Sequence, residues 1–381
     1  MDITKIRYYH LHKQNLIEKA APDDYRKLLK EHIGLHSTDY LTPYISLWAR
    51  VKDFEPKSLF DDLNDPFNAL RMRAFRGTIF VIHKENLATI ISAAKIFQSS
   101  TINNFKKYLL KSGLDPAEIE QEVANSIANK NELTIHQLKK ELPDHLIDQN
   151  FSYALRYLEF KGALIRTNHR YITDRVIRYG FTAEWLPGIN KTEMSPDEAL
   201  RTLILNYIEK FGPISLNDLA WWLPITKTIA RKMLNDLADQ LVNFDFNNKE
   251  YFMEQADYQK FEDFNFKENP GTVINFLPYE DHFPKAYSLR SWFLKDEVTP
   301  LVSKAGTIYM GQIFPSIWLN GQIIGGWEMN WIDKKKSAMK ITITNILEEQ
   351  NLSQEIHHKI ENQRAELENF VNIKLIPLMK R

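Results

Sequence analysis

The sequence predicts a mainly α-helical protein with β-hairpins (an α+β fold): three tandem winged-helix motifs in a curved array, closed by a C-terminal β-rich region. Two segments follow one plan of helix, helix and two-stranded hairpin, and an earlier segment follows it less clearly. Residues 271–345 instead alternate strand-like runs with glycine turns. We therefore expect a first winged helix with linking helices over 1–110, a second over 111–190, a third over 191–256, and a C-terminal region with a closing helix over 257–381.

The second unit shows the plan most simply. A short helix is expected to begin within 133–138, and a second helix begins near Phe151 with apolar residues at helical spacing. Residues 161–166 then turn into a strand, 167–170 read as a hairpin tip, and 171–173 begin the returning strand. This order of elements is a winged-helix pattern.

The third unit follows the same plan, and the residues that begin and end its elements are easier to recognise. Gly212-Pro213 ends its first helix, since proline does not continue one, and Ser215 is a typical N-cap for the next. Asn247-Asn248 suits the left-handed backbone of a tight hairpin turn. The expected elements are helices over 200–211 and 216–223, a recognition-type helix opened by Thr226 or Thr228 and running to 237, and strands at 241–246 and 251–254.

The remaining segments are assigned more coarsely. The first unit is expected over about 15–83, with a strand at 76–82 in its wing and one or two linking helices over 85–110. The strands expected in the C-terminal region are 307–317, 322–331 and 339–343, with a charged turn at 333–337 and a final helix over about 348–369.

Composition excludes several classes of protein. The 381 residues contain no run of about 18 apolar residues, and the N-terminus lacks an apolar signal core, so we expect a cytoplasmic protein without membrane contact. Zero cysteines exclude disulfides, cysteine zinc sites and thiol catalysis. The 13 glycines form no phosphate-cradling loop, so we expect no cofactor. His10 and His12 lack a third ligand nearby, and Gly34 argues against a regular helix that would place His32 and His36 on one face, so we expect no metal.

One short polar patch stands out in the first unit. Residues 33–39 place His36, Ser37, Thr38 and Asp39 beside Gly34, just before an apolar, aromatic helix. Glycine lets the backbone turn and another surface come close. Thr42 is expected to cap the following helix, and Pro43 suits its first turn. The patch fits either a functional site at the mouth of a helix or ordinary capping chemistry.

Several separated segments together resemble one family. They resemble the bacterial tandem winged-helix proteins that include the alkylpurine and interstrand-crosslink DNA glycosylases. The segments are Gly34-Leu35-His36-x-Thr38, Leu47-Trp48-x-Arg50, Arg76-Gly77-Thr78, Glu184-Trp185-Leu186-Pro187, the block from Tyr207 through Phe211-Gly212-Pro213 to Trp222, Leu277-Pro278-Tyr279-Glu280-Asp281, and Asn320-Gly321 through Gly325-x-Trp327.

The resemblance implies hydrolysis of the bond between sugar and base. Family members carry a polar pair after Gly-Leu, usually Gln-x-Gln or Gln-x-Asp, with histidine first in some; here the matching positions are His36 and Thr38. A histidine accepts a proton or orients water near neutral pH, whereas threonine hydrogen-bonds water but is no base. Asp39, one residue later, either reaches the site or caps the helix behind it. His36, Thr38 and Asp39 are therefore the candidate catalytic residues, and His36 is equally open to a structural role.

Basic residues are distributed as a DNA-binding face would require. The 49 basic and 49 acidic residues cancel, which argues weakly against DNA binding, but phosphate contacts depend on a local patch. We expect the DNA-binding residues to be Arg73, Arg76, Arg156, Arg166, Arg170, Lys227 and Arg231. Those of the first two units should share a concave face with His36, opposite the acidic stretches at 254–268 and 348–368.

The sequence thus leads to one function and two alternatives. We expect a monomeric protein that binds double-stranded DNA and acts in DNA repair as a monofunctional DNA glycosylase (a hydrolase). Its substrates would be cationic N-alkylated purines, as single adducts or crosslinks. No covalent link to DNA is expected, since no lysine lies within the patch itself. The alternatives are a non-catalytic winged-helix DNA-binding protein, either a regulator or a lesion binder, which Thr38 favours, and a protein-interaction module, which the zero net charge favours.

Overall fold

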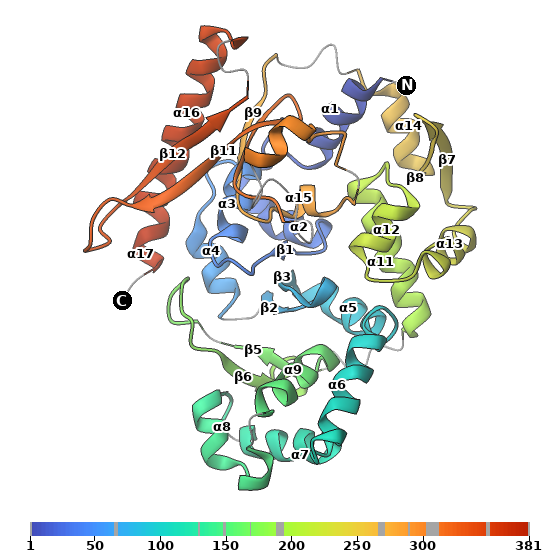
Figure 1. Cartoon of the computed structure of the whole chain (residues 1–381), viewed down its shortest axis with the longest axis vertical. Coiled ribbons are helices and arrows are strands. Elements are labelled where there is room, and N and C mark those ends of the chain that lie inside the picture. Colours follow the sequence, from blue (N-terminus) through green and yellow to red (C-terminus); the bar gives the residue numbers. More distant parts are fainter. Residues whose placement is uncertain are drawn as a thin grey trace.

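The computed structural model confirms an α+β fold in which small antiparallel sheets are surrounded by helices (Figure 1). The structure describes residues 2–64, 68–128, 130–147, 150–167, 169–187, 194–265, 271–288, 290–301, 312–347 and 351–379. Within these ranges no helix has both the length and the apolar character needed to cross a lipid bilayer.

The first unit is a winged helix with its hairpin at the end. Thr42 does not cap the third helix as expected: Leu41 is the N-cap, and the Thr42 hydroxyl donates to the carbonyl of Tyr279 at 2.7 Å. The expected strand at 76–82 begins later, after a 3-10 turn over Phe75–Gly77. The elements are α1 Ile3–Lys13, α2 Tyr25–Glu31, β1 Leu35–His36, α3 Thr42–Arg50, α4 Pro56–Asp62, β2 Ala69–Arg73 and β3 Ile79–His83.

Two linking helices and the second winged helix follow. The returning strand of this wing is not at 171–173, where it was predicted. Asp174 accepts the backbone N–H groups of Arg170 and Val176, which makes a turn there, and the strand begins only at Arg178. The elements are α5 Lys84–Phe97, α6 Ser99–Lys111, α7 Pro116–Ile127, β4 Leu133–Thr134, α8 Ile135–Glu141, α9 Phe151–Lys161, β5 Leu164–Arg166, β6 Arg178–Phe181 and α10 Thr182–Trp185.

The third winged helix agrees closely with its prediction. Ser215 forms a capping box with Asp218, Thr226 rather than Thr228 caps the recognition-type helix, and Asn247 and Asn248 adopt φ values of 50° and 57° in the hairpin turn. The elements are α11 Pro196–Phe211, α12 Leu216–Trp222, α13 Lys227–Asp236, β7 Leu241–Phe246 and β8 Lys249–Glu254.

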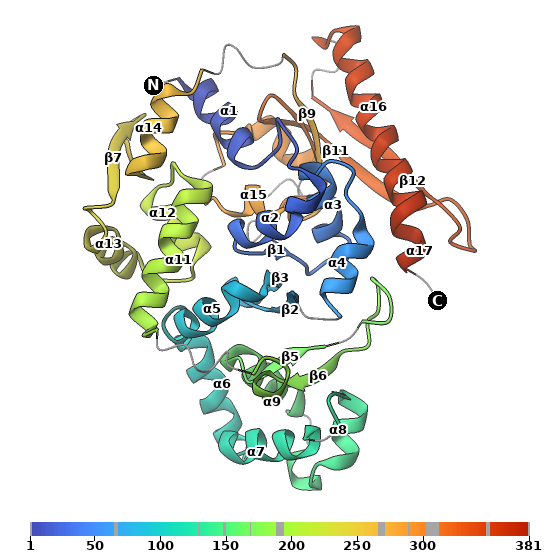
Figure 2. The same cartoon turned by 180° about the vertical axis from the view of Figure 1, so that it is seen from behind.

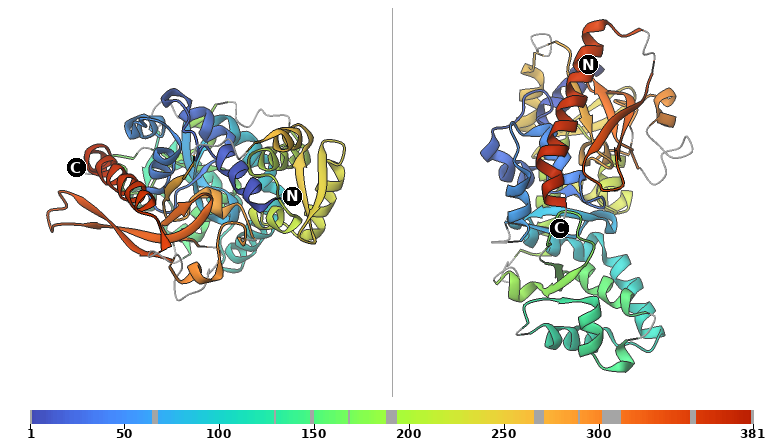
Figure 3. Two further views of the ribbon diagram at one scale, coloured as in Figure 1. Left: turned by 90° about the horizontal axis from the view of Figure 1, so that it is seen from above. Right: turned by 90° about the vertical axis from the view of Figure 1, so that its left-hand side faces the viewer.

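The C-terminal region is a four-stranded antiparallel sheet in the order β12-β11-β10-β9, with α16 along one face (Figures 1 and 2). The β11–β12 hairpin projects from the body with the predicted charged turn at its tip (Figure 3). Part of the strand expected at 307–317 and the start of the helix expected at 348–369 lie outside the described residues. The elements are α14 Gln255–Asp263, β9 Ile274–Leu277, α15 His282–Lys285, β10 Ser316–Leu319, β11 Gln322–Trp331, β12 Met339–Ile346, α16 Gln354–Phe370 and α17 Ile376–Met379.

The units share their cores unequally. Buried side chains of the first unit, the third unit and the C-terminal region form one continuous cluster. The second unit has a smaller cluster of its own, from Leu109 to Tyr179, and extends away from the rest of the molecule (Figure 3). A six-stranded sheet in the order β1-β3-β2-β5-β6-β4 joins the first and second units, with Arg71 opposite Arg166 at the junction. The short strand β1 at one edge of this sheet carries the polar patch.

Candidate functional site

His36 is placed by the pairing of two strands. β1 runs antiparallel to β3, with His36 opposite Phe80, and the two rings make an edge contact at 5.3 Å. The residue before β1 is Gly34, with φ of 130°; a Cβ there would lie 2.4 Å from Cδ1 of Ile82. Glycine is therefore required for β1 to approach β3 this closely, as the sequence suggested.

The His36 side chain is enclosed and neutral. Only 1% of His36 is exposed, and within the described ranges neither ring nitrogen has a hydrogen-bond partner. Burial, together with the positive charge of Lys285, lowers the pKa of His36 to about 3. The imidazole is uncharged near neutral pH, so one ring nitrogen is free to accept a hydrogen bond.

The group facing His36 is a carboxylate from the C-terminal region. Oε2 of Glu280 lies 3.5 Å from Nε2 of His36 and 2.6 Å from Nζ of Lys285. Glu280 is 4% exposed and has a φ of 58°, which is uncommon for a residue with a side chain. Its backbone N–H donates to the carbonyl of Ile313, and its Oε1 accepts the N–H of the same residue.

A buried ion pair anchors this segment to the first unit. Asp281, next to Glu280, accepts hydrogen bonds from both Nη atoms of Arg50 in α3, at 2.7 and 2.9 Å, and from the hydroxyl of Ser46. Burial raises the pKa of Asp281, but Arg50 and the other groups around the carboxylate, Ser46 and His282, together outweigh burial, and the pKa falls to about 2. The next residue, His282, is hydrogen-bonded to His32 of the first unit. The segment that bears Glu280 is therefore held firmly against α3 and β1.

Glu280 opens onto a small cavity with aromatic walls. The cavity has a volume of about 160 Å³. The guanidinium of Arg76 stacks on Trp221 beside it, 3.5 Å from the ring centre, and Nη1 of Arg76 is buried with no partner in the described part of the chain. The lining residues are His32, Gly34, Phe75, Arg76, Thr78, Phe80, Phe211, Trp222, Glu280, His282, Lys285 and Gln312.

Thr38 and Asp39 follow β1 in the chain. Both residues are exposed, and Oδ1 of Asp39 accepts the backbone N–H of Leu41 at 2.9 Å. Asp39 also borders a second cavity of about 470 Å³, which Tyr279 shares. The described residues that line the cavity of Glu280 include none of the three candidate catalytic residues, and His36 lies beside this cavity through its 3.5 Å approach to Glu280.

The predicted DNA-binding residues differ in exposure and in pairing. Arg73 and Arg166 both bind Glu159, at 3.0 and 2.7 Å, and Arg166 is buried. Arg156 and Arg170 are exposed on the second unit. In the third unit Lys227 is exposed, and Arg231 pairs with Glu250 at 2.7 Å in an exposed ion pair.

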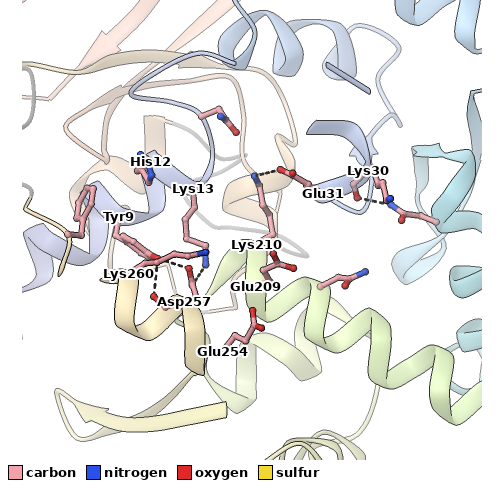
Figure 4. A pocket seen from close by; sticks show the side chains of 14 residues that line it. Tyr9, His12, Lys13, Lys30, Glu31, Glu209, Lys210, Glu254, Asp257 and Lys260 are labelled. Carbon is pink, nitrogen blue, oxygen red and sulfur yellow. Dashed lines mark hydrogen bonds and ion pairs between the residues drawn. The ribbon is translucent and has the colours of Figure 1, made fainter. Parts of the chain in front are cut away.

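A larger cavity, of about 560 Å³, lies between α1, α2, α11 and α14 (Figure 4). Its charged groups are mixed and largely paired: Lys13 binds Asp257, and Lys210 lies 3.4 Å from Glu31. Burial lowers the pKa of Lys210 to about 8. None of the sequence-predicted site residues lines this cavity. Among the residues that the structure describes, no cluster of three histidine or acidic side chains has the arrangement of a metal site.

Sequence reasoning missed the second half of the site. From the sequence, Glu280 was noted only as part of a segment that resembles the family, and Lys285 was not predicted to have a role. A lysine does stand beside His36 in space, although the patch itself contains none. The available signal was the acidic pair Glu280-Asp281 following an apolar strand-like run.

The comparisons with known proteins agree with this architecture. Residues 29–370 match the family model described as "DNA glycosylase AlkZ-like". No curated protein matches the sequence. Among solved structures, the DNA glycosylase AlkZ of Streptomyces sahachiroi is similar over 98% of both chains, with a TM-score of 0.78 and 18% sequence identity. At that identity, the likeness to the solved structure establishes the fold.

Proposed function

The chain belongs to the AlkZ-like family of DNA glycosylases, and we propose that it is a monofunctional enzyme that removes purines alkylated on a ring nitrogen. Such a purine carries a positive charge and leaves as a neutral base. The enzyme's task is therefore to stabilise the positive charge that develops on the sugar and to position one water molecule. The observation that supports this reaction best is the neutral, enclosed imidazole of His36 beside Glu280.

His36 is proposed to orient the attacking water. A neutral imidazole accepts a hydrogen bond from water, and the ring contact with Phe80 fixes its direction. We propose that Thr38 and Asp39 contribute to catalysis only if their exposed turn rearranges, because Oδ1 of Asp39 accepts the backbone N–H of Leu41. Lys285 is engaged with Glu280 at 2.6 Å, and we propose that it forms no imine with the abasic product.

The proposed partner is double-stranded DNA, bound by a monomer in the cytoplasm. Arg156 and Arg170 are exposed on the second unit, and phosphate contacts require such accessible cations. Arg76, Lys227 and Arg231 are proposed to extend this contact. Arg73 and Arg166 are proposed to contribute positive potential while shaping the surface through Glu159.

The direct test uses duplex oligonucleotides that carry N7- or N3-alkylpurines. Released base is measured by chromatography, and abasic sites are measured as strand breaks after hot alkali. We expect base release by the wild type, no strand break before alkali, and no protein–DNA adduct trapped by borohydride. Release of no base from any single adduct or crosslink would refute the proposal.

One observation favours a non-catalytic lesion binder instead. Thr38 stands where the family has a glutamine or aspartate, and threonine is no base. A binder would hold alkylated duplexes more tightly than undamaged ones while leaving the glycosidic bond intact. Binding and release measured on the same oligonucleotide therefore separate the two functions.

A further inference from the structure

We infer that Glu280 is the catalytic carboxylate of this protein, stabilising the cationic sugar and taking the proton of the attacking water. The inference rests on the proposed glycosylase function and names a residue outside the polar patch. Glycoside hydrolysis uses carboxylates for both tasks, because a fixed negative charge favours a developing cation and accepts a proton.

The acidic groups near His36 differ in what they face. Asp39 is exposed and its Oδ1 accepts the N–H of Leu41. Asp281 is fully buried, and its two oxygens accept from Arg50, Ser46 and the N–H of Phe283. Glu280 also has both oxygens in contacts, with the N–H of Ile313 and with Lys285, but it faces His36 and lines the cavity with aromatic walls.

The position of Glu280 is set by several independent contacts. Its backbone adopts a φ of 58° and its N–H donates to the carbonyl of Ile313, while the N–H of Ile313 donates to Oε1 of Glu280. Lys285, in the helix that directly follows, binds Oε2 at 2.6 Å. A non-glycine residue in this backbone region is held there by its surroundings, and such residues concentrate at functional sites. Here the neighbouring Arg50–Asp281 pair provides the rigid support.

The surrounding charge suits a cationic sugar attached to anionic phosphates. Glu280 provides a negative charge beside the neutral imidazole, while the cations Arg76 and Lys285 line the same cavity. The carboxylate would face the sugar carbon, and the cations would face the phosphates on either side. Phe75, Phe80 and Trp222 give the cavity an aromatic lining for the base.

The proposed step is balanced without a cofactor. The bond between C1′ and the purine nitrogen breaks, and its electron pair neutralises the cationic base. The water oxygen bonds to C1′, and one of its protons passes to the carboxylate of Glu280 and then to solvent. His36 accepts a hydrogen bond from the same water and keeps no proton.

Three variants test the role of Glu280. Glu280→Gln keeps size and hydrogen bonding but loses the charge, Glu280→Asp keeps the charge and shortens the reach, and Glu31→Gln is a matched control from the larger cavity. Single-turnover rates on alkylated duplex are measured beside affinity for undamaged duplex and thermal unfolding. We expect Glu280→Gln to lower the rate constant by about 10²-fold or more at unchanged duplex affinity. The rate constant of Glu280→Asp should lie between those of Glu280→Gln and the wild type. The rate constant of Glu31→Gln should equal that of the wild type.

A second measurement does not depend on turnover. Duplexes carrying a cationic pyrrolidine analogue of the sugar are compared with duplexes carrying a neutral tetrahydrofuran at the same position. The wild type is expected to prefer the cationic analogue by about tenfold or more, and Glu280→Gln to lose that preference. Because both duplexes bind the same variant, a general folding defect cancels from the ratio.

The outcomes separate the inference from the proposed function. A wild type that releases no base refutes the glycosylase proposal. In that case the ratio of affinities for the pyrrolidine and tetrahydrofuran duplexes still tests whether Glu280 stabilises a cationic sugar. A folded Glu280→Gln protein with wild-type rate and wild-type preference overturns the inference. Loss of rate and preference together, with Glu31→Gln unaffected, supports it.

Discussion

Arg50 and Asp281 form a buried two-pronged ion pair that joins helix α3 to the segment carrying Glu280. Both side chains are fully buried, and the two N–O distances are 2.7 and 2.9 Å. Each charge depends on the other, since an unpaired charge in the interior is strongly unfavourable. The pair also fixes the distance between β1 and the start of α15, and therefore the approach of Glu280 to His36.

Asp281→Asn is expected to destabilise the protein by about 3–5 kcal/mol, because it leaves Arg50 as an uncompensated buried charge. Urea unfolding followed by circular dichroism measures the change. Asp61→Asn breaks an exposed pair with Lys57 and should change stability by less than about 1 kcal/mol. Equal stability of Asp281→Asn and wild type would show that Arg50 finds other compensation.

His36→Ala is expected to reduce the single-turnover rate by about 10²-fold, because the attacking water loses an oriented acceptor. His36→Gln should recover part of this loss, since an amide oxygen accepts the same hydrogen bond. His12→Ala, at an exposed position of α1, is the matched control. If His36→Ala reacts at the wild-type rate, His36 has only a structural role.

Acid should destabilise the folded protein well before carboxylates titrate. Burial lowers the pKa of His10, His36 and His282 to about 3, from an ordinary value of 6.5. Below pH 6.5 the unfolded chain binds protons at these imidazoles and the folded chain does not. The stabilisation is therefore complete above pH 6.5 and is lost as pH falls toward 3, by about 1.4 kcal/mol per pH unit for each imidazole.

Unfolding free energies between pH 7.5 and 5 check this expectation. His10→Phe should reduce the slope of unfolding free energy against pH by the contribution of about one proton. A phenyl ring keeps the stacking on Trp292 and Tyr287 but does not titrate. A stability that is flat over this range would contradict the assignment.

Charge reversal on the second unit should separate DNA contact from structure. Arg170→Glu is expected to weaken binding to any duplex sequence. It should also lower the slope of log affinity against log salt concentration by the amount that corresponds to about one phosphate contact. Arg166→Glu should instead destabilise the unit, because it places a second carboxylate against buried Glu159.

Fluorescence anisotropy at several salt concentrations, with thermal unfolding of each variant, measures both effects. Lys359→Glu on α16 is the control, as it lies in the stretch expected to face away from DNA. Normal binding by Arg170→Glu and by Arg156→Glu would place the duplex elsewhere on the protein.

Local chemistry explains which elements were predictable. The third winged helix was predicted to within about four residues at each end of its elements, because Ser215, Gly212-Pro213 and Asn247-Asn248 act through neighbours in the sequence. The returning strand of the second unit was misplaced, because the turn at Asp174 interrupts an apparently continuous hairpin. That interruption depends on side-chain hydrogen bonds that a β-propensity pattern does not carry.

The site was only half predictable for a related reason. His36 and Gly34 belong to one segment, so their pattern is visible in the sequence. Glu280 meets His36 only through the pairing of Arg50 with Asp281, two residues that are 231 positions apart. Arg166 likewise reads as a surface cation, and only the fold places it against Glu159. Contacts between distant segments leave no periodic signal in the sequence.

The wide separation of His36, Arg76 and Glu280 along the chain has a consequence during synthesis. A ribosome that has completed all three winged helices has made the histidine and the aromatic walls, but not the carboxylate facing them. Arg50 in α3 also has no Asp281 counterion until the segment that carries Glu280 and Asp281 has been synthesised. The nascent protein therefore gains this buried charge pair and the carboxylate that faces His36 together, so a chain terminated before this segment would lack both.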